Sequence, residues 1–273
     1  MTQIIHQSPL GKKSAPATAY SPSLLFPIER RIKREEIGIS SPLPFKGVDI
    51  WNSYEFSWLN AKGKPRVALI ECHIPSHSHS LIESKSFKLY LNSFSQTRFS
   101  TIEDIIDTLH HDISGAVGSS ISIKVLQLQE LVGQKLEEFS GICLDGLDIE
   151  TDQYTLDPSL LQCSEEIVEE DVYSHLLKSN CLITGQPDWA SILIRYRGKR
   201  IDHPSLLKYL ISFRQHCEFH EHCVERIFMD ICHWCKPRQL TVYARYTRRG
   251  GLDINPFRSN FEAFPKNFRE VRQ

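Results

Sequence analysis

The sequence predicts an α+β fold in which paired helices cover one face of an antiparallel sheet, with this arrangement occurring twice in the chain. Each half shows a strand pattern, then two helical stretches, then another strand pattern. The first strand of this set recurs at residues 65 and 191 and the last at 120 and 240, which are offsets of 126 and 120 residues. Similar offsets indicate a divergent internal duplication of one supersecondary unit.

The composition is that of a globular enzyme or binding domain. The chain has 273 residues, 41% of them hydrophobic, and a net charge of −1. It lacks an apolar run of ~20 residues that could span a bilayer, and it lacks the basic surplus of a dedicated polyanion binder. The start, MTQIIHQSPLGKK, has no apolar signal-peptide core, and eight cysteines are spread through the chain. We therefore expect a cytoplasmic protein with reduced thiols.

The chain divides into three predicted parts. Residues 1–24 are rich in Ser, Pro and Ala and are interpreted as a flexible leader. Residues 25–150 form the N-terminal half and residues 151–273 the C-terminal half.

Periodicity predicts matching elements in the two halves. In the N-terminal half, Ser100 is the expected N-cap of the second helix, with Glu103 at the third helical position, and Gly115 and Gly118 are expected to end it. The predicted elements are strands at 65–74, 120–128, 191–197 and 240–247, and helices at 85–95, 102–113, 204–213 and from 219 to the residue before Pro237.

Several familiar catalytic motifs are absent from the sequence. No Gly-x-Gly-x-x-Gly follows a strand, and neither Gly-x-Ser-x-Gly nor His-Glu-x-x-His occurs. The Cys/His-rich run at 214–223, followed by Cys232 and Cys235, has the residue types and C-x-x-C spacing of a zinc site. The helical pattern there, with Cys235 on its apolar stripe, favours roles without a metal.

Two clusters carry possible chemistry near predicted loop-to-helix or loop-to-strand junctions. Residues 81–90, LIESKSFKLY, combine a carboxylate, hydroxyls and lysines where a helix begins, which suits an anionic group. An amphipathic helix with a solvated lysine face is the alternative. In residues 176–189, the thiol of Cys181 precedes Asp188, and a thiol and an acid could act as nucleophile and proton donor. A buried inert cysteine is the alternative.

A third cluster lies at residues 243–251, YARYTRRGG, a basic strand end with two glycines. Such a segment could hold a phosphate, and a solvated run of charge is the alternative reading.

Four segments in order resemble the long form of the NADPH-dependent nitrile reductases of queuosine biosynthesis, the 7-cyano-7-deazaguanine reductases. These segments are ESKSFKLYLNSF at 83–94, LKSNCLITGQPDW at 177–189, FHEHCVERI at 219–227 and YARYTRRGGLDINP at 243–256. The resemblance runs from about Leu43 to Gln273. It implies the tunnel fold, in which sheets with outer helices assemble into a barrel across subunits and long members carry two halves per chain.

The resemblance also implies an activity: reduction of the nitrile of 7-cyano-7-deazaguanine to the aminomethyl group, with two NADPH in succession and no metal. Cys181 matches the nucleophile that forms a covalent thioimide, and Asp188 matches the proton donor. The positions that match the remaining family sites are Ile82, Glu83, Ser84, His220 and Glu221 for substrate, and Ser84, Lys85, Arg249 and Gly250 for NADPH. On charge alone, Arg245 and Arg248 are further candidates for the cofactor 2′-phosphate.

We expect the protein to bind a small-molecule substrate and to form a homodimer. We expect no direct nucleic-acid or membrane partner. Where the family commonly has glycine after its Asp-Trp pair, this chain has Ala190. Two other functions stay open from sequence. One is a zinc-dependent cyclohydrolase-like enzyme of the same fold that uses the Cys/His cluster at 216–235. The other is a non-catalytic RNA-binding scaffold.

Overall fold

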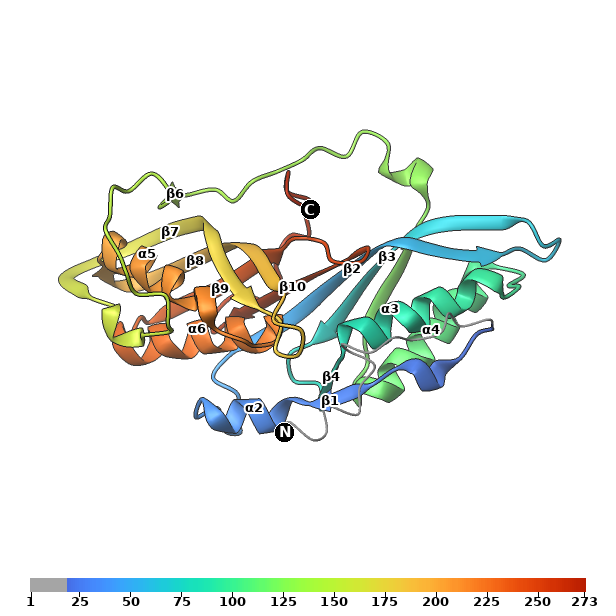
Figure 1. Cartoon of the computed structure of the whole chain (residues 1–273), viewed down its shortest axis with the longest axis horizontal. Helices are drawn as coiled ribbons and strands as arrows, with labels where there is room; N and C mark the ends of the chain where they lie inside the picture. The colour runs from blue at the N-terminus through green and yellow to red at the C-terminus, as the bar shows by residue number, and fades with distance from the viewer. Residues whose placement is uncertain (1–18) are drawn as a thin grey trace. The chain divides into compact units, whose positions relative to one another are not determined.

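A computed structural model describes residues 19–273, which form two compact units. The first unit holds the described residues up to Ile32 together with Asp49–Lys135 and Arg248–Ile254. The second unit holds Lys33–Val48, Leu136–Thr247 and Asn255–Gln273. Figure 1 colours the chain by residue number, so that the mixed origin of each unit can be followed.

The first unit is a sheet covered on one face by two helices (Figure 1). Its sheet has the strand order β5-β3-β2, and β1 and β4 form a separate two-stranded ribbon. Its elements are β1 (Pro27–Glu29), α2 (Arg30–Glu36, which continues into the second unit), β2 (Lys46–Leu59), β3 (Pro65–Pro75), β4 (Ser80–Ile82), α3 (Ser84–Ser93), α4 (Ile102–Val117) and β5 (Ser122–Leu126).

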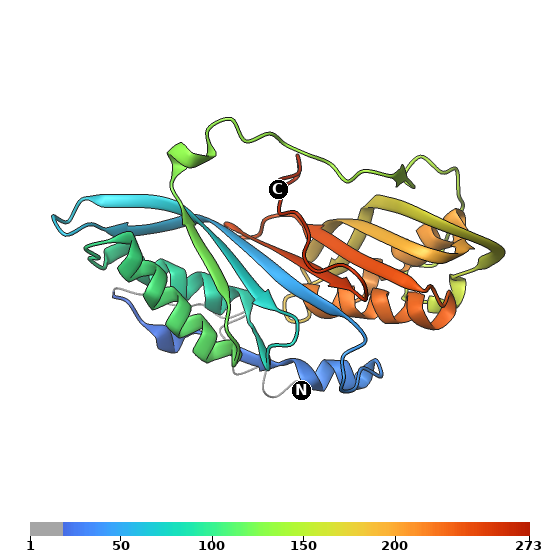
Figure 2. The same ribbon diagram turned by 180° about the vertical axis from the view of Figure 1, so that it is seen from behind.

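Alternation in β3 explains this layering. From Ala68 to Ile74 every second side chain is buried, and these side chains pack with Ile105, Leu109 and Ile113 of α4 in one core. The apolar residues of α4 recur at helical spacing and those of β3 recur at every second position. The two sets therefore pack against each other between the helix and the sheet. Figure 2 shows the strands of this unit from the side opposite to Figure 1.

The cap of α4 lies one residue later than predicted. Thr101, not Ser100, is the N-cap: its hydroxyl accepts from the Asp104 main-chain N at 3.0 Å, and Asp104 accepts from the Thr101 N at 3.0 Å. The predicted end at Gly115 is also wrong, because the helix continues to Val117. Gly118 ends it in the left-handed conformation (φ 65°), which glycine adopts without steric cost.

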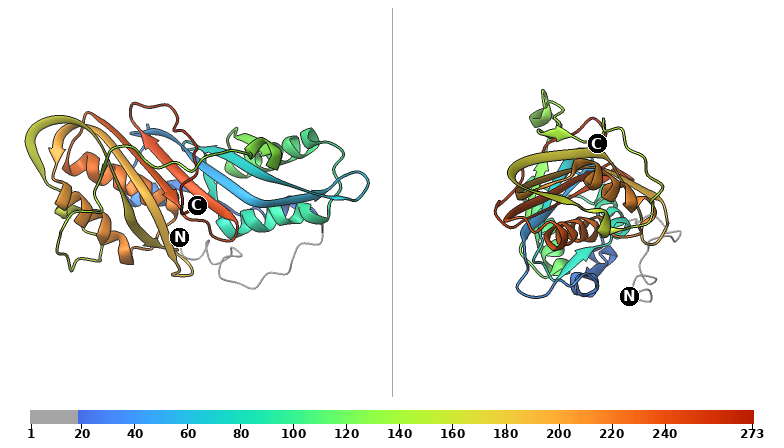
Figure 3. Two further views of the ribbon diagram at one scale, coloured as in Figure 1. Left: turned by 90° about the horizontal axis from the view of Figure 1, so that it is seen from above. Right: turned by 90° about the vertical axis from the view of Figure 1, so that its left-hand side faces the viewer.

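The second unit repeats the layering with its own core. Its strand order is β10-β9-β8-β7-β6, in which the pairs β10–β9, β9–β8 and β8–β7 are antiparallel and the pair β7–β6 is parallel. The two views of Figure 3 show α5 and α6 on one side of these strands. The elements are β6 (Ile142–Cys143), β7 (Cys163–Asn180), β8 (Pro187–Ile201), α5 (His203–Ser212), α6 (His220–Trp234), β9 (Gln239–Tyr246) and β10 (Leu252–Ser259, which begins in the first unit).

Hydrogen bonds between the paired helices are the same in both units. The Tyr90 hydroxyl on α3 donates to Asp112 on α4 at 2.7 Å, and the Tyr209 hydroxyl on α5 donates to Asp230 on α6 at 2.7 Å. The two tyrosines are separated by 119 residues and the two aspartates by 118. Bonds conserved at one offset support the internal duplication that the sequence predicts.

A second repeat was not recognised in the sequence pattern. The four residues Pro-Ser-Leu-Leu occur at 22–25 and again at 158–161. Both copies begin with a short 3-10 helix, Pro22–Leu24 and Pro158–Leu160, that precedes the strands of its half. Strand and helix periodicity does not reveal this repeat, because its four residues show neither a period of two nor a period of 3.6.

The compact units are not the two contiguous stretches 25–150 and 151–273. Residues 33–48 and 136–150 belong to the second unit, and residues 248–254 belong to the first. A division into contiguous halves does not allow for chain segments that cross between units. Of the predicted leader, residues 1–18 lie outside the described residues, but Tyr20 is held: its hydroxyl donates to Asp112 at 2.6 Å.

The predicted α+β class, with two antiparallel-sheet halves that each carry paired helices on one face, is confirmed. Assembly into a barrel between subunits stays a prediction. Among residues 19–273, no helix has the length and apolarity needed to cross a membrane.

Candidate active site

The predicted site residues fall into two groups, one in each compact unit. In the second unit, Cys181 is the first residue of the turn that joins β7 to β8. Its main-chain N donates to the Gln186 carbonyl at 2.8 Å, and its carbonyl accepts from the Gly185 N at 3.0 Å. Gly185 takes a left-handed conformation (φ 65°) that closes this turn. The thiol is therefore held at the end of a hairpin, with 8% of the residue exposed.

Asp188 lies on β8 directly opposite Ser179 of β7. Paired residues on neighbouring strands point to the same face, as do residues two apart on one strand. The side chains of Asp188 and Cys181 are therefore on one face of the hairpin. Asp188 is buried (3% exposed), and His220 Nε2 lies 3.3 Å from its Oδ2.

His220 and Glu221 reach this hairpin because α6 begins next to it. The Asn180 main-chain N donates to the His216 carbonyl at 2.8 Å, and the Glu218 N donates to the Asn180 carbonyl at 3.1 Å. This parallel bridge fixes the segment before α6 beside Cys181. Glu221, the second residue of α6, is buried with 2% exposure.

Tyr246 is a site residue that the sequence reasoning missed. Its ring stacks on the His220 imidazole, with 3.9 Å between ring centroids and 23° between planes. The tyrosine is fully buried, and burial raises its pKa well above the ordinary value, so the phenol stays neutral. The stacking holds the imidazole towards Asp188. Only its place in the YARYT segment could have suggested it.

The first unit has no thiol at the position that matches Cys181. In the β2–β3 turn, the Asn60 N donates to the Lys64 carbonyl at 2.9 Å and the Gly63 N donates to the Asn60 carbonyl at 2.8 Å, which is the pattern made by Cys181 in a loop one residue shorter. Asn60 therefore occupies the equivalent place, and only the second hairpin carries a nucleophile.

The substrate-site candidates of the first unit lie at the junction of β4 and α3. Glu83 is the N-cap of α3: its carboxylate accepts from the Lys85 N at 2.6 Å and the Ser86 N at 2.9 Å. Burial raises the pKa of Glu83, while the main-chain donors and Lys85 oppose that shift. Ile82 is buried, whereas Ser84 and Lys85 are half-buried. The junction thus presents a buried carboxylate beside a helix N-terminus.

The cofactor candidates Arg249 and Gly250 form a tight turn in the same unit. The Arg249 N donates to the Leu252 carbonyl at 2.8 Å, and both intervening glycines have positive φ, 58° and 79°. A Cβ on Gly250 would lie 2.8 Å from Lys88 Nζ of α3. The turn and the lysine-bearing face of α3 are therefore neighbours. Lys88 was missed as a candidate, and its signal is its spacing of three residues from Lys85.

The two further arginine candidates differ. The Arg248 guanidinium lies over the Tyr54 ring, 4.8 Å from its centroid, within the first unit. Arg245 lies in the second unit, is 1% exposed, and donates to Gln273 Oε1 at 2.7 Å while its guanidinium stacks over Phe268. In this structure the Arg245 guanidinium fastens the C-terminal segment, and its assignment to the 2′-phosphate stays a prediction.

The Cys/His cluster at 216–235 does not form a metal centre in the part of the chain that the structure describes. Most of its members lie along α6, and Cys223 and Cys235 face the core. Within residues 19–273, a single set of three His, Cys, Asp or Glu side chains has ligand atoms close enough for one ion, and it lies elsewhere, at Cys143, Asp145 and His175. Helical spacing spreads the 216–235 side chains around and along the helix.

Comparisons with known proteins match both halves of the chain. Residues 17–125 match the family described as "Nitrile reductase, 7-cyano-7-deazaguanine-reductase N-term", and residues 187–264 match "QueF-like protein". Relatives named NADPH-dependent 7-cyano-7-deazaguanine reductase are 60% identical in Cupriavidus necator and 57% identical in Ralstonia nicotianae. Both alignments cover 97% of this chain and 98% of the relative. The apo archaeosine synthase QueF-Like, a solved structure, is 15% identical with a TM-score of 0.32 over 37% of this chain and 98% of that chain.

Both relatives are matched over nearly the full length of the two proteins compared. The chain belongs to the family of NADPH-dependent 7-cyano-7-deazaguanine reductases.

Proposed function

We propose that this protein reduces the nitrile of 7-cyano-7-deazaguanine to the aminomethyl group of 7-aminomethyl-7-deazaguanine, with NADPH as reductant, in the pathway that makes queuosine for tRNA. Family membership gives the reaction. The observation that carries the residue assignment is the grouping of Cys181, Asp188, His220 and Glu221 at one end of the second unit.

Cys181 is the proposed nucleophile. A nitrile is a poor hydride acceptor, whereas a protonated thioimide is a good one. The thiol adds across the triple bond: sulfur bonds to the nitrile carbon, and the nitrile nitrogen gains a proton. Carbon is thereby prepared for hydride: a first hydride, which NADPH would supply, allows the C–S bond to break, which returns the thiol and leaves an imine. A second hydride, from a second NADPH, together with a further proton, would reduce that imine to the amine. The hairpin turn supports this role because it fixes the thiol in place.

Asp188 is the proposed route for protons to and from the substrate nitrogen. Its place on the same hairpin face as Cys181 and its burial support this role. His220 Nε2, 3.3 Å from Asp188 Oδ2, can exchange that proton through its ring nitrogen. The proton that the Cys181 thiol gives up balances the one that Asp188 delivers.

Substrate recognition is proposed for Ile82, Glu83, Ser84, His220 and Glu221. The guanine-like edge of the substrate presents N–H donors, which buried carboxylates can accept. A base without these donors would not gain these hydrogen bonds from the carboxylates, which favours the guanine-like substrate over other bases.

NADPH is proposed to contact Ser84, Lys85, Arg249 and Gly250, with Lys88 and Arg248 as added candidates. The residues fit a phosphate-bearing group, because a glycine turn without side-chain bulk lies beside Lys88 at the start of a helix. When bound, NADPH supplies the hydride. Lysine and arginine side chains here would bind and orient its phosphates.

The test is NADPH consumption by the purified chain with 7-cyano-7-deazaguanine, with the amine product identified by mass spectrometry. Without NADPH, intact-mass measurement should detect a covalent adduct in the wild type and in Cys217→Ala, which removes an exposed thiol, but none in Cys181→Ala, which removes the buried one. An adduct that persists in Cys181→Ala would refute the nucleophile assignment, and absence of turnover with this substrate would refute the function.

We also propose a cytoplasmic homodimer with no direct nucleic-acid partner. The balanced charge of the chain supports the last point. Light scattering on the purified protein tests the dimer. Salt-dependent binding of tRNA at physiological ionic strength would contradict the proposal and favour the scaffold alternative.

A further inference from the structure

We propose that Cys143, Asp145 and His175 bind a divalent transition-metal ion, with zinc the best match, and that the ion fastens the linker segment (residues 136–162) to strand β7. The site is separate from the residues assigned to the reaction, and its role is structural. It lies entirely within the second unit.

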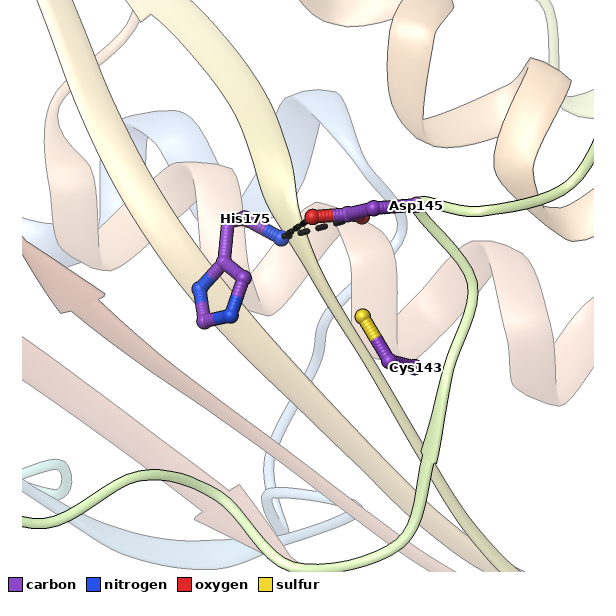
Figure 4. A group of neighbouring side chains, drawn as sticks. All are labelled: Cys143, Asp145 and His175. Carbon is purple, nitrogen blue, oxygen red and sulfur yellow. Dashed lines mark hydrogen bonds between the residues drawn. The ribbon is translucent and has the colours of Figure 1, made fainter.

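The backbone brings the three side chains together. Cys143 belongs to β6, which pairs in parallel with β7 so that Cys143 lies opposite Tyr173. The Leu144 N donates to the Tyr173 carbonyl at 2.9 Å, which places Asp145 beside the residues of β7 that follow Tyr173. One ligand atom from each of Cys143, Asp145 and His175 lies within 4.8 Å of the other two. Figure 4 shows two of these side chains on the linker and the third on β7.

The linker approaches β7 unusually closely at this point. Gly141 has φ 129°, and a Cβ on it would lie 2.3 Å from the Asp171 carbonyl oxygen. Only glycine allows the two backbones to come this near. The close approach therefore depends on the glycine at position 141, and it is independent of the three candidate ligands.

The candidate ligands are already oriented by hydrogen bonds. Asp145 Oδ1 accepts from the Ser174 hydroxyl at 2.6 Å, and its Oδ2 accepts from the His175 main-chain N at 3.0 Å (Figure 4 shows the latter contact). His175 Nδ1 lies 2.7 Å from the Ser191 hydroxyl. Outer partners of this kind fix a carboxylate and an imidazole in place for metal binding.

The donor set selects the type of ion. A thiolate, an imidazole and a carboxylate suit zinc or cobalt, whereas calcium and magnesium take oxygen ligands. Glu138 Oε1 lies 3.0 Å from His175 Nε2 but is outside the set whose ligand atoms lie within 4.8 Å of one another, so a water molecule would supply the fourth ligand. With Nε2 on the metal, Nδ1–H can donate to Ser191. The three side chains and this water would complete a tetrahedral coordination.

The test is titration of the full chain, freed of metal by a chelator, with Co²⁺ and then Zn²⁺. We expect about one cobalt per chain with a thiolate-to-cobalt charge-transfer band, as for a tetrahedral site with cysteine, and loss of the band when zinc is added. Cys143→Ser and His175→Gln should lose the band, whereas Cys217→Ser, which removes another exposed thiol, should keep it.

A second readout tests the fastening. Zinc should slow proteolytic cleavage within residues 136–162 in the wild type and in Cys217→Ser, but not in Cys143→Ser. No cobalt band in the wild type, or a band unchanged in Cys143→Ser, would overturn the metal site. A band lost as proposed, without any change in the rate of linker cleavage, would overturn the fastening role.

Discussion

At the scale of single residues, burial sets the chemistry of two titratable side chains, Asp188 in the candidate site and His216 near it. Asp188 is buried against His220, which is itself stacked on Tyr246. Asp188 is placed to transfer a proton, because its burial excludes most water and the His220 imidazole is close enough to exchange the proton with it. His216, close to the nucleophile hairpin, is a half-buried titratable group whose Nε2 is enclosed.

Replacing Asp188 with Asn should leave substrate binding intact and slow turnover by about 100-fold or more, since an amide cannot deliver a proton and general acids contribute factors of about 10² to 10⁴. Steady-state kinetics should show the loss in kcat rather than in KM. The matched control is Asp152→Asn, an exposed carboxylate outside the site. Turnover within a few-fold of wild type in Asp188→Asn would exclude it as the acid.

His216 gives a prediction for pH. Burial, together with the charges of Arg226 and Lys33, lowers the pKa of His216 to about 4. A folded-state pKa below the unfolded value contributes stability that is present above pH of about 6.5 and lost as pH falls towards 4, by up to ~3 kcal/mol. Urea unfolding at pH 7 and pH 5 should show a smaller stability loss in His216→Phe than in the wild type.

The control for this measurement is His110→Gln, because His110 is an exposed residue of α4. That variant should keep the wild-type difference between the two pH values. If His216→Phe also kept it, His216 would not be the group that destabilises the acid form.

At the scale of elements, the helices were predicted well and their ends less well. The periods of α4 and β3 are local properties of the chain, so both elements could be found from sequence. The N-cap was placed one residue early because Ser100 and Thr101 are both good caps, and each is followed three residues later by an acid. The choice between them depends on backbone conformation, which periodicity does not report.

The capping box of α4 can be tested directly. Thr101→Ala removes the hydroxyl that accepts from Asp104 and should lower the free energy of unfolding by ~1 kcal/mol. Ser100→Ala, at the position favoured by sequence alone, should leave it nearly unchanged. Chemical denaturation of the two variants compares them, and equal effects would show that the cap assignment is wrong.

At the scale of the whole molecule, long-range charge pairs explain why the second unit contains segments far apart in sequence. Glu225 on α6 is fully buried between two arginines, Arg34 and Arg258. Arg34 Nη2 lies 2.6 Å and Arg258 Nη2 lies 2.8 Å from Glu225 Oε1. These two charges lower the pKa of Glu225, so the carboxylate stays ionised in the folded protein. Residues 33–48 and 255–273 are thereby joined to α6.

Replacing Glu225 with Gln should destabilise the protein by about 3–5 kcal/mol, because it leaves two buried arginines without their counter-charge. The control is Glu165→Gln, which removes an exposed partner of Lys199 and should cost less than about 1 kcal/mol. Thermal and urea unfolding measure both variants. A loss in Glu225→Gln no larger than in the control would contradict the importance assigned to this cluster.

The sequence by itself determined the local structure and the family: periods of two and 3.6 residues located the strands and helices, and four ordered motifs pointed to the nitrile reductases. Only the tertiary structure decided which distant residues meet. It placed His220 against Asp188, bonded the buried Arg245 to Gln273, put Lys88 beside the Gly250 turn, and assigned residues 33–48 to the second unit. The physical reason is that periodicity and capping depend on neighbours along the chain, whereas these contacts depend on how strands pair and on which charges are buried together.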